Sequence, residues 1–146
     1  MVFTHRDKLI LSAIIALFAV RLVTIHTIQL SPDDAYYWNW GQHPSLAYSD
    51  HPPMVAWLMA FFTALGGNSE LFVRLGGFLL SAAALFFLFA TARTLFPAHR
   101  DLSWDVLLAF NVTLLFPAGS IIQTPDTPML FFWAAAAWCG SRIVAG

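Results

Sequence analysis

Apolar residues are arranged in four long runs separated by short polar segments. The first run, from Leu9 to Leu30, has about 22 residues, enough to cross roughly 30 Å of hydrocarbon as an α-helix. The runs at 71–96, 104–122 and 129–144 are predicted to be a second, a third and a marginal fourth span. The pattern therefore predicts an all-α integral membrane protein with about four transmembrane helices.

The segment between the first two predicted spans, residues 31–70, has a different pattern. Ser31 suits a helix N-cap, Pro32 suits the first helical position and acids suit the first turn, which predicts a short helix through Trp40. A second helix is predicted to begin at Asp50–Pro53 and to end near Leu65. That helix is apolar on all sides but only about 20 Å long, so we expect two short interfacial helices in this loop.

Basic residues at the two ends of the spans predict the topology. Arg6 and Lys8 precede the first span and place the N-terminus in the cytoplasm, so that loop 31–70 lies on the extracytoplasmic side. If the second short helix does not cross the membrane, Arg93, His99 and Arg100 face the cytoplasm. That arrangement agrees with the excess of positive charge expected on cytoplasmic segments.

Arg21 lies about two-thirds of the way along the first run. It interrupts the run, and no small-x-small cleavage site precedes Ser31, so an uncleaved span is favoured over the alternative of a signal peptide. An ionisable residue inside a span usually faces other helices or a water-filled cavity. The alternative is that its side chain reaches along the helix to the far interface. The sequence leaves both orientations of Arg21 open.

Composition supports a membrane protein and excludes several kinds of site. Hydrophobic residues make up 59% of the 146 residues, and charged residues 10% against about 25% in an ordinary soluble domain. The net charge of -1 argues against a nucleic-acid partner. The lone Cys139 excludes an internal disulfide and a cysteine-based zinc site. Residues 1–146 are expected to form one membrane domain, the N-terminal part of a larger protein, because the last run stops abruptly at Gly146.

The predicted topology brings the scarce polar groups to one face of the membrane. Taken singly, the acids at 33, 34 and 126 are good helix starts, because carboxylates favour the positive end of the helix dipole. Together they indicate a site, since a carboxylate accepts a proton or holds a metal and cations hold an anion. Beside apolar surface this set suits a lipid-phosphate substrate. The set consists of Asp33, Asp34, Asp50, His51, Arg74 and Asp126.

Four motifs in this order resemble the N-terminal part of the polytopic glycosyltransferases of the GT-C fold. They are Asp33–Trp38, Tyr48–Pro53, Glu70–Leu75 and Thr124–Pro128. The chain is most similar to the bacterial branch related to protein O-mannosyltransferases and to the lipid A aminoarabinose transferase. The resemblance covers nearly the whole chain and implies a bacterial inner-membrane enzyme with its active loop, residues 31–70, on the extracytoplasmic side.

The resemblance also implies a reaction. The family transfers a sugar from a polyprenyl-phosphate donor to an acceptor hydroxyl on a glycan, lipid or protein, usually with inversion. Asp33 corresponds to the first acid of the family's acidic pair, implicated as general base or metal-site residue, and Asp34 stands where glutamate is usual. Asp50 and His51 correspond to a motif in which a lysine suits the donor phosphate, and Asp126 to a later acidic position in the same cavity.

The sequence also holds candidates for a metal site and for aromatic contacts, and it is compatible with two other functions. A divalent metal is a candidate cofactor, with Asp33 and Asp126 as candidate ligands, although the sequence holds no compact ligand cluster. Tyr36 and Tyr37 are candidates for stacking on the sugar or the prenyl chain, or are interfacial anchors. A transporter or channel component and a non-catalytic assembly subunit are the alternative functions. A 146-residue piece would lack part of the active-site cavity and is expected to be inactive alone.

Overall fold

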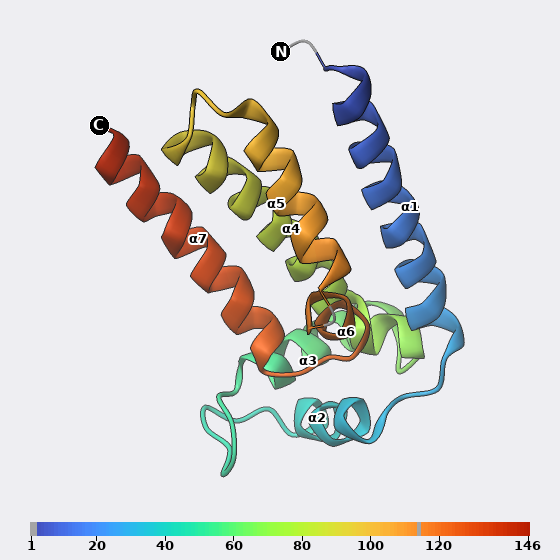
Figure 1. Ribbon diagram of the computed structural model, residues 1–146. Coiled ribbons are helices and arrows are strands. Elements are labelled where there is room, and N and C mark those ends of the chain that lie inside the picture. The colour runs from blue at the N-terminus through green and yellow to red at the C-terminus, as the bar shows by residue number, and fades with distance from the viewer. Residues whose placement is uncertain (1–2, 114) are drawn as a thin grey trace.

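The computed structural model describes residues 3–113 and 115–146, and within these ranges the secondary structure is entirely helical (Figure 1). The all-α fold class is confirmed. The helices are α1 (His5–Thr27), α2 (Pro32–Gln42), α3 (Met54–Gly66), α4 (Glu70–Leu95), α5 (Arg100–Val112), α6 (Leu115–Ile121) and α7 (Asp126–Ala145).

The helices α1, α4, α5 and α7 run along the molecule, and α2, α3 and α6 gather at one end (Figure 1). In Figure 1 both termini lie at the top and α2, α3 and α6 lie at the bottom, which we call the loop end. Within the part of the chain that the structure describes, three helices are long and apolar enough to cross a membrane, namely α1 with 23 residues, α4 with 26 and α7 with 20. They correspond to the first, second and fourth predicted spans, and the protein is an integral membrane protein.

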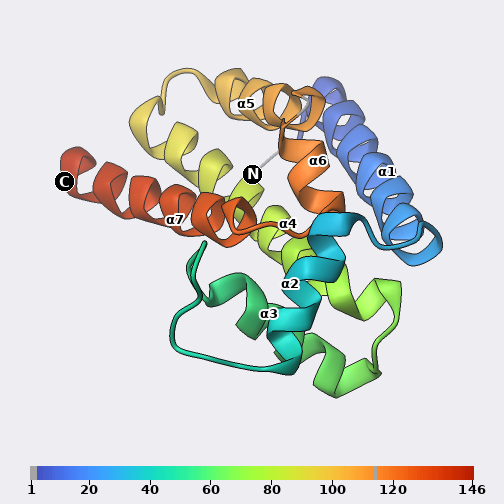
Figure 2. The same ribbon diagram turned by 90° about the horizontal axis from the view of Figure 1, so that it is seen from below.

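The two short helices predicted within residues 31–70 are confirmed. α2 begins with a capping box, in which Ser31 Oγ accepts from the Asp34 N–H at 3.1 Å and the Asp34 carboxylate accepts from the Ser31 N–H at 3.0 Å. Seen from below, α2 and α3 lie side by side across the loop end (Figure 2). The chain therefore enters and leaves this segment at the same end of the molecule, and α3, with 13 residues, is shorter than the helices that could cross a membrane.

The predicted third span, residues 104–122, is not one continuous helix. α5 ends at Val112, Thr113 is extended with φ -73° and ψ 136°, and α6 starts at Leu115. Pro117 explains the break, because in a continuous helix its ring would clash with the carbonyl group of Thr113. α6 then runs in a different direction from α5 (Figures 1 and 2). Hydropathy alone did not reveal this break, since apolar residues continue through it.

α4 is the centre of the fold and contacts each of the other six helices. In the most apolar 18-residue stretch of α4, 50% is buried in the molecule, against 22% in the corresponding stretch of α1 and 17% in that of α7. At Gly77 the Gln123 side chain lies so close to the α4 backbone that a Cβ atom would overlap its Oε1 atom. Glycine at this position therefore leaves room for the buried Gln123 side chain against α4.

Adding a methyl group at Gly77 is expected to destabilise the protein. The Gly77→Ala side chain would overlap the buried Gln123 side chain, and overpacking of this kind costs about 1–3 kcal/mol. Thermal unfolding in detergent micelles measures the effect. Gly140→Ala is the matched control, because no atom lies within 4 Å of a Cβ there and alanine is the better helix former. Equal unfolding temperatures for the two variants would contradict close packing at Gly77.

Candidate active site at the loop end

Asp34 and Arg74 form a buried ion pair at the loop end. Their side chains are 0% and 2% exposed, and Arg74 Nε and Nη2 donate to Asp34 Oδ2 at 3.0 and 2.8 Å. Arg74 Nη1 also donates to the Ile28 carbonyl oxygen at 2.7 Å, and Nη2 to the Gln29 carbonyl oxygen at 2.8 Å. A further bond from Nη1 to Ile25, at 3.4 Å, brings all five N–H groups of the guanidinium into use.

The Asp34 carboxylate is equally occupied. Its Oδ2 atom accepts from the Ser31 hydroxyl at 2.8 Å, and its Oδ1 atom accepts from the backbone N–H of Gln123 at 2.7 Å. The pair thus joins the end of α1, the start of α2, the start of α4 and the segment before α7. A proton or a phosphate would have to displace these partners, so the geometry favours a positioning role for Asp34 and Arg74 over contact with substrate.

Asp33 lies outside this network and faces a cavity. It is exposed, and with the exposed Asp126 it lines a cavity of about 610 Å³ at the loop end. The two acids come from the first turns of α2 and α7, which are more than 90 residues apart in the chain. The remaining lining residues are mostly apolar or small: Ser81, Phe110, Thr113, Phe116, Ala118, Gly119, Ile122, Thr124, Thr127, Met129 and Leu130.

Tyr37 lies close enough to three of the predicted acids for their charges to affect its pKa. Burial of its side chain, 6% exposed, raises the pKa of the phenol, and the negative charges of Asp33, Asp126 and Asp50 raise it further. Its ring also lies edge-on to the ring of His51, with 5.8 Å between centroids. The phenol therefore stays protonated at neutral pH and is available as a hydrogen-bond donor among these acids.

Tyr36 and Asp50 form a second contact between predicted residues. The Tyr36 hydroxyl donates to Asp50 Oδ2 at 2.6 Å, and this bond is the main reason that the pKa of Tyr36 is raised. On the same helix, the Trp40 ring stacks on Tyr48 with 4.2 Å between centroids. These contacts hold the segment between α2 and α3 against α2. They place Asp50 and His51 beside Tyr37, which lies on the same helix, α2, as Asp33.

Asp33 and Asp126 remain the candidate ligands for a divalent metal. Mg²⁺ sites often use one or two carboxylates together with substrate phosphate oxygens and water. Across residues 3–113 and 115–146, no three His, Cys, Asp or Glu side chains converge as a ready-made metal site. The two acids could thus serve a metal only together with oxygen atoms from substrate or water.

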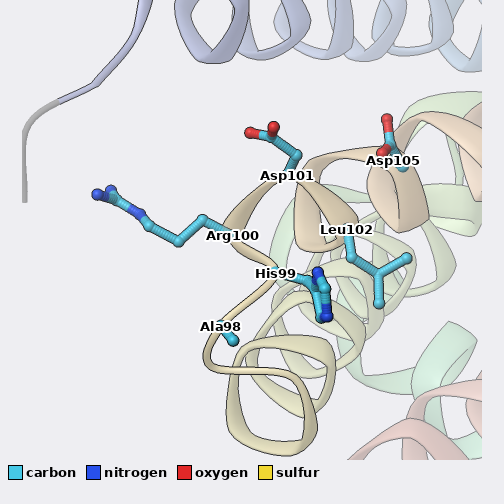
Figure 3. A pocket seen from close by; sticks show the side chains of 6 residues that line it. All are labelled: Ala98, His99, Arg100, Asp101, Leu102 and Asp105. Atoms are coloured by element: carbon cyan, nitrogen blue, oxygen red, sulfur yellow. The ribbon is translucent and has the colours of Figure 1, made fainter.

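A second pocket, of about 600 Å³, lies at the opposite end of the molecule, at the turn between α4 and α5 (Figure 3). Figure 3 shows the side chains of His99, Arg100, Asp101 and Asp105 around it. Both of these acids form ion pairs with Arg6 of α1, the Asp101 pair at 3.2 Å. None of the predicted site residues lines this pocket. The ion pairs of Arg6 with Asp101 and Asp105 connect α1 to α5.

Sequence reasoning did not identify two features of the loop end. Gln123 is 1% exposed and binds Asp34 through its backbone N–H, a role that no side-chain pattern shows. The cavity wall formed by the break between α5 and α6 was also missed. Its signals were Asn111 and Pro117, the polar residue and the helix breaker inside a predicted span.

Comparison with known proteins identifies the family. Residues 50–145 match the family model described as dolichyl-phosphate-mannose-protein mannosyltransferase, a GT-C glycosyltransferase family. The chain belongs to this family. The resemblance predicted from the four motifs is thereby confirmed, and the match includes Asp50, His51, Arg74 and Asp126, whereas Asp33 and Asp34 precede it.

One similar curated protein is the lipid A galacturonosyltransferase RgtD of Rhizobium johnstonii. The two sequences are 32% identical over 133 residues, which cover 90% of this chain and 28% of the relative. The mannosyltransferase-family chain therefore spans a little over a quarter of that relative's length. No solved structure matches this chain.

Proposed function

We propose that the protein is a membrane glycosyltransferase that moves a sugar from a polyprenyl-phosphate donor to an acceptor hydroxyl. Membership of the mannosyltransferase family supports the reaction class. The observation that carries the proposal is the cavity at the loop end, where two exposed carboxylates meet an apolar wall. An apolar wall suits a prenyl chain, and a carboxylate at its edge suits proton removal from a hydroxyl.

In this mechanism Asp33 is the general base. Its carboxylate takes the proton of the acceptor hydroxyl while the hydroxyl oxygen attacks the anomeric carbon of the sugar. The bond from that carbon to the phosphate oxygen breaks, and the polyprenyl phosphate leaves with the electron pair. A single displacement of this kind inverts the anomeric configuration. Asp33 fits the role because it is exposed, whereas the adjacent Asp34 is buried and occupied.

The groups around Asp33 supply orientation and charge. His51, exposed and beside Tyr37, is the basic residue proposed to bind the donor phosphate. Tyr36 is exposed and presents aromatic surface that suits a sugar ring, and the buried Tyr37 packs edge-on against it. Asp126 is the second acid of the cavity, proposed to bind substrate hydroxyl groups or a metal. Arg74 acts through Asp34, by holding α2 in place.

The orientation in the membrane follows from the charges. Arg6, Lys8, Arg93, Arg100 and Arg142 all belong to the end of the molecule that carries the termini and the turn between α4 and α5. An excess of basic residues marks the cytoplasmic side, so the loop end is proposed to face the extracytoplasmic side of a bacterial inner membrane.

The comparisons suggest which substrates to test first. The family description names dolichyl-phosphate mannose and protein, and the relative's name gives lipid A and a galacturonosyl group. Mannose and galacturonic acid, each carried on a polyprenyl phosphate, are therefore the donor sugars that we propose to test first. Lipid A and a hydroxyl-bearing peptide are the proposed acceptors.

A donor comparison in the full-length protein tests the proposal. Reconstituted protein is incubated with polyprenyl-phosphate mannose, polyprenyl-phosphate galacturonic acid or UDP-galacturonic acid, each with lipid A or a hydroxyl-bearing peptide. We expect sugar transfer and release of polyprenyl phosphate with at least one lipid-linked donor, and no transfer from the nucleotide sugar. Transfer from the nucleotide sugar alone, or solute flux without transfer, would contradict it.

A further inference from the structure

Arg21 is a buried cation in α1 that the proposed mechanism does not use. Its side chain is 4% exposed, and it donates from Nη1 to Asn111 Oδ1 at 2.9 Å and from Nη2 to the Asn111 carbonyl oxygen at 3.1 Å. Of the two orientations left open by the sequence, the structure shows the one facing other helices. A buried charge inside a membrane span is costly, so the groups that bind Arg21 indicate which part of the fold this charge stabilises.

The Asn111 carbonyl is available because the third span is broken. In a continuous helix this oxygen would accept from the N–H of residue 115, but α5 ends at Val112. The Asn111 side chain is itself fixed, since its Nδ2 atom donates to the Leu107 carbonyl oxygen at 2.9 Å. Arg21 therefore binds both the freed backbone and the fixed side chain at the end of α5.

Arg21 also reaches the other side of the break. Its guanidinium carbon lies 5.9 Å from the centre of the Phe116 ring in α6, and 5.0 Å from that of Phe18 in α1. Phe116 is 4% exposed and lines the cavity together with Phe110 and Thr113. One cation thus contacts α5 before the break and α6 after it, and both elements form the cavity wall.

We propose that Arg21 and Asn111 are positioning residues that hold the broken third span in the shape of an apolar wall for the donor's lipid chain. The identity of that chain rests on the proposed function. We call the contact between Arg21 and Asn111 the brace. It does not touch the reacting atoms, so its loss changes how a lipid chain fits the wall and leaves the chemistry at Asp33 in place. Donors with long prenyl chains depend on the wall more than donors with short ones.

Donor kinetics of the full-length protein test the brace. Arg21→Leu is expected to raise the KM for a long-chain polyprenyl-phosphate sugar about tenfold while kcat changes less than about threefold. The KM for a short-chain donor changes less. Arg21→Lys cannot form the same bidentate contact, so its KM for the long-chain donor is expected to lie between those of the wild type and Arg21→Leu. Leu22→Ala on the exposed side of α1 is the matched control and keeps the wild-type KM.

A double-mutant cycle adds a readout that a merely structural role would not move. Asn111→Ala is expected to raise the long-chain KM as Arg21→Leu does, and the double variant no further than either single one. An unchanged long-chain KM, independent effects of the two substitutions, or equal losses with both chain lengths would overturn the inference. Asn111→Ala leaves the backbone carbonyl acceptor for Arg21 in place, so it keeps the test available if Arg21→Leu does not fold.

Direct binding of polyprenyl phosphate without a sugar separates this inference from the proposed function. Weaker binding by Arg21→Leu in a protein that transfers no sugar would support the brace and refute the transferase. Normal transfer with an unchanged KM would refute the brace and leave the transferase intact. A wild-type protein that binds no polyprenyl phosphate would overturn the inference.

Discussion

Replacing Asp34 by alanine is expected to lower the free energy of unfolding by about 3–5 kcal/mol, the usual cost of removing one partner of a buried ion pair. The substitution leaves the Arg74 guanidinium, 2% exposed, without its carboxylate. It also removes the acceptor for the Gln123 N–H and the carboxylate of the α2 capping box. Denaturant titration in detergent micelles measures the loss, which is a large part of a typical protein's total stability.

Two variants make this prediction specific. Asp33→Ala, one residue away on the same helix turn, removes an exposed carboxylate and is expected to cost about 1 kcal/mol or less. The double variant Asp34→Ala, Arg74→Ala is expected to lose less than the sum of its single substitutions, because neither charge is then left alone. A fully stable Asp34→Ala protein, or additive losses, would show that the pair does not support the fold.

The location of the pair explains why a charged contact serves here. Arg74 binds carbonyl groups at the C-cap of α1 and just after it, where the helix dipole favours a cation, and Asp34 lies in the first turn of α2, where it favours an anion. The network fixes α2 relative to α1 and α4. Because Asp33 precedes Asp34 directly, fixing α2 also fixes Asp33 at the cavity.

Much of the fold was predictable because it follows from length and local chemistry. The apolar runs behind α1 and α4 are long enough to cross roughly 30 Å of hydrocarbon, and the marginal run behind α7 belongs to a helix of 20 residues. The Ser31–Pro32 start of α2 is a local capping pattern. The break after Val112 was not predicted, since hydropathy measures the polarity of side chains and not the continuity of the backbone. Pro117 carried that information, but proline is tolerated in many spans.

The site was predictable as a location and less so as a set of roles. Topology alone brought Asp33 and Asp126 to one end of the molecule, where they line one cavity. The difference between Asp33 and Asp34 depends on which carboxylate meets Arg74, 40 residues further along the chain, and the Gln123 backbone. Contacts over such distances in sequence arise from tertiary packing, and no local pattern reports them. The partnership of Arg21 with Asn111 was hidden for the same reason.

Replacing Asp33 by asparagine is expected to reduce sugar transfer by about 10²–10⁴-fold, the usual contribution of a general base. Asparagine has nearly the same shape as aspartate and still accepts a hydrogen bond, but it cannot take the proton of the acceptor hydroxyl. The exposed position of Asp33 means that the variant keeps the wild-type stability. The loss is therefore expected in the rate of the chemical step and not in the amount of folded protein.

The second acid of the cavity is the matched control for this assignment. Asp126→Asn removes a carboxylate that lines the same cavity from α7, and it is expected to reduce transfer less than Asp33→Asn does. A larger loss with Asp126→Asn would assign the base to Asp126. Asp33→Glu keeps a carboxylate at a longer reach and is expected to retain part of the activity.

Single-turnover transfer by the full-length protein tests the general-base assignment most directly. Wild type and Asp33→Asn, matched for folded protein, are loaded with saturating polyprenyl-phosphate sugar and mixed with acceptor. We expect Asp33→Asn to bind the donor with wild-type affinity and to form product at least about 100-fold more slowly. Product formation at the wild-type rate would show that Asp33 is not the general base.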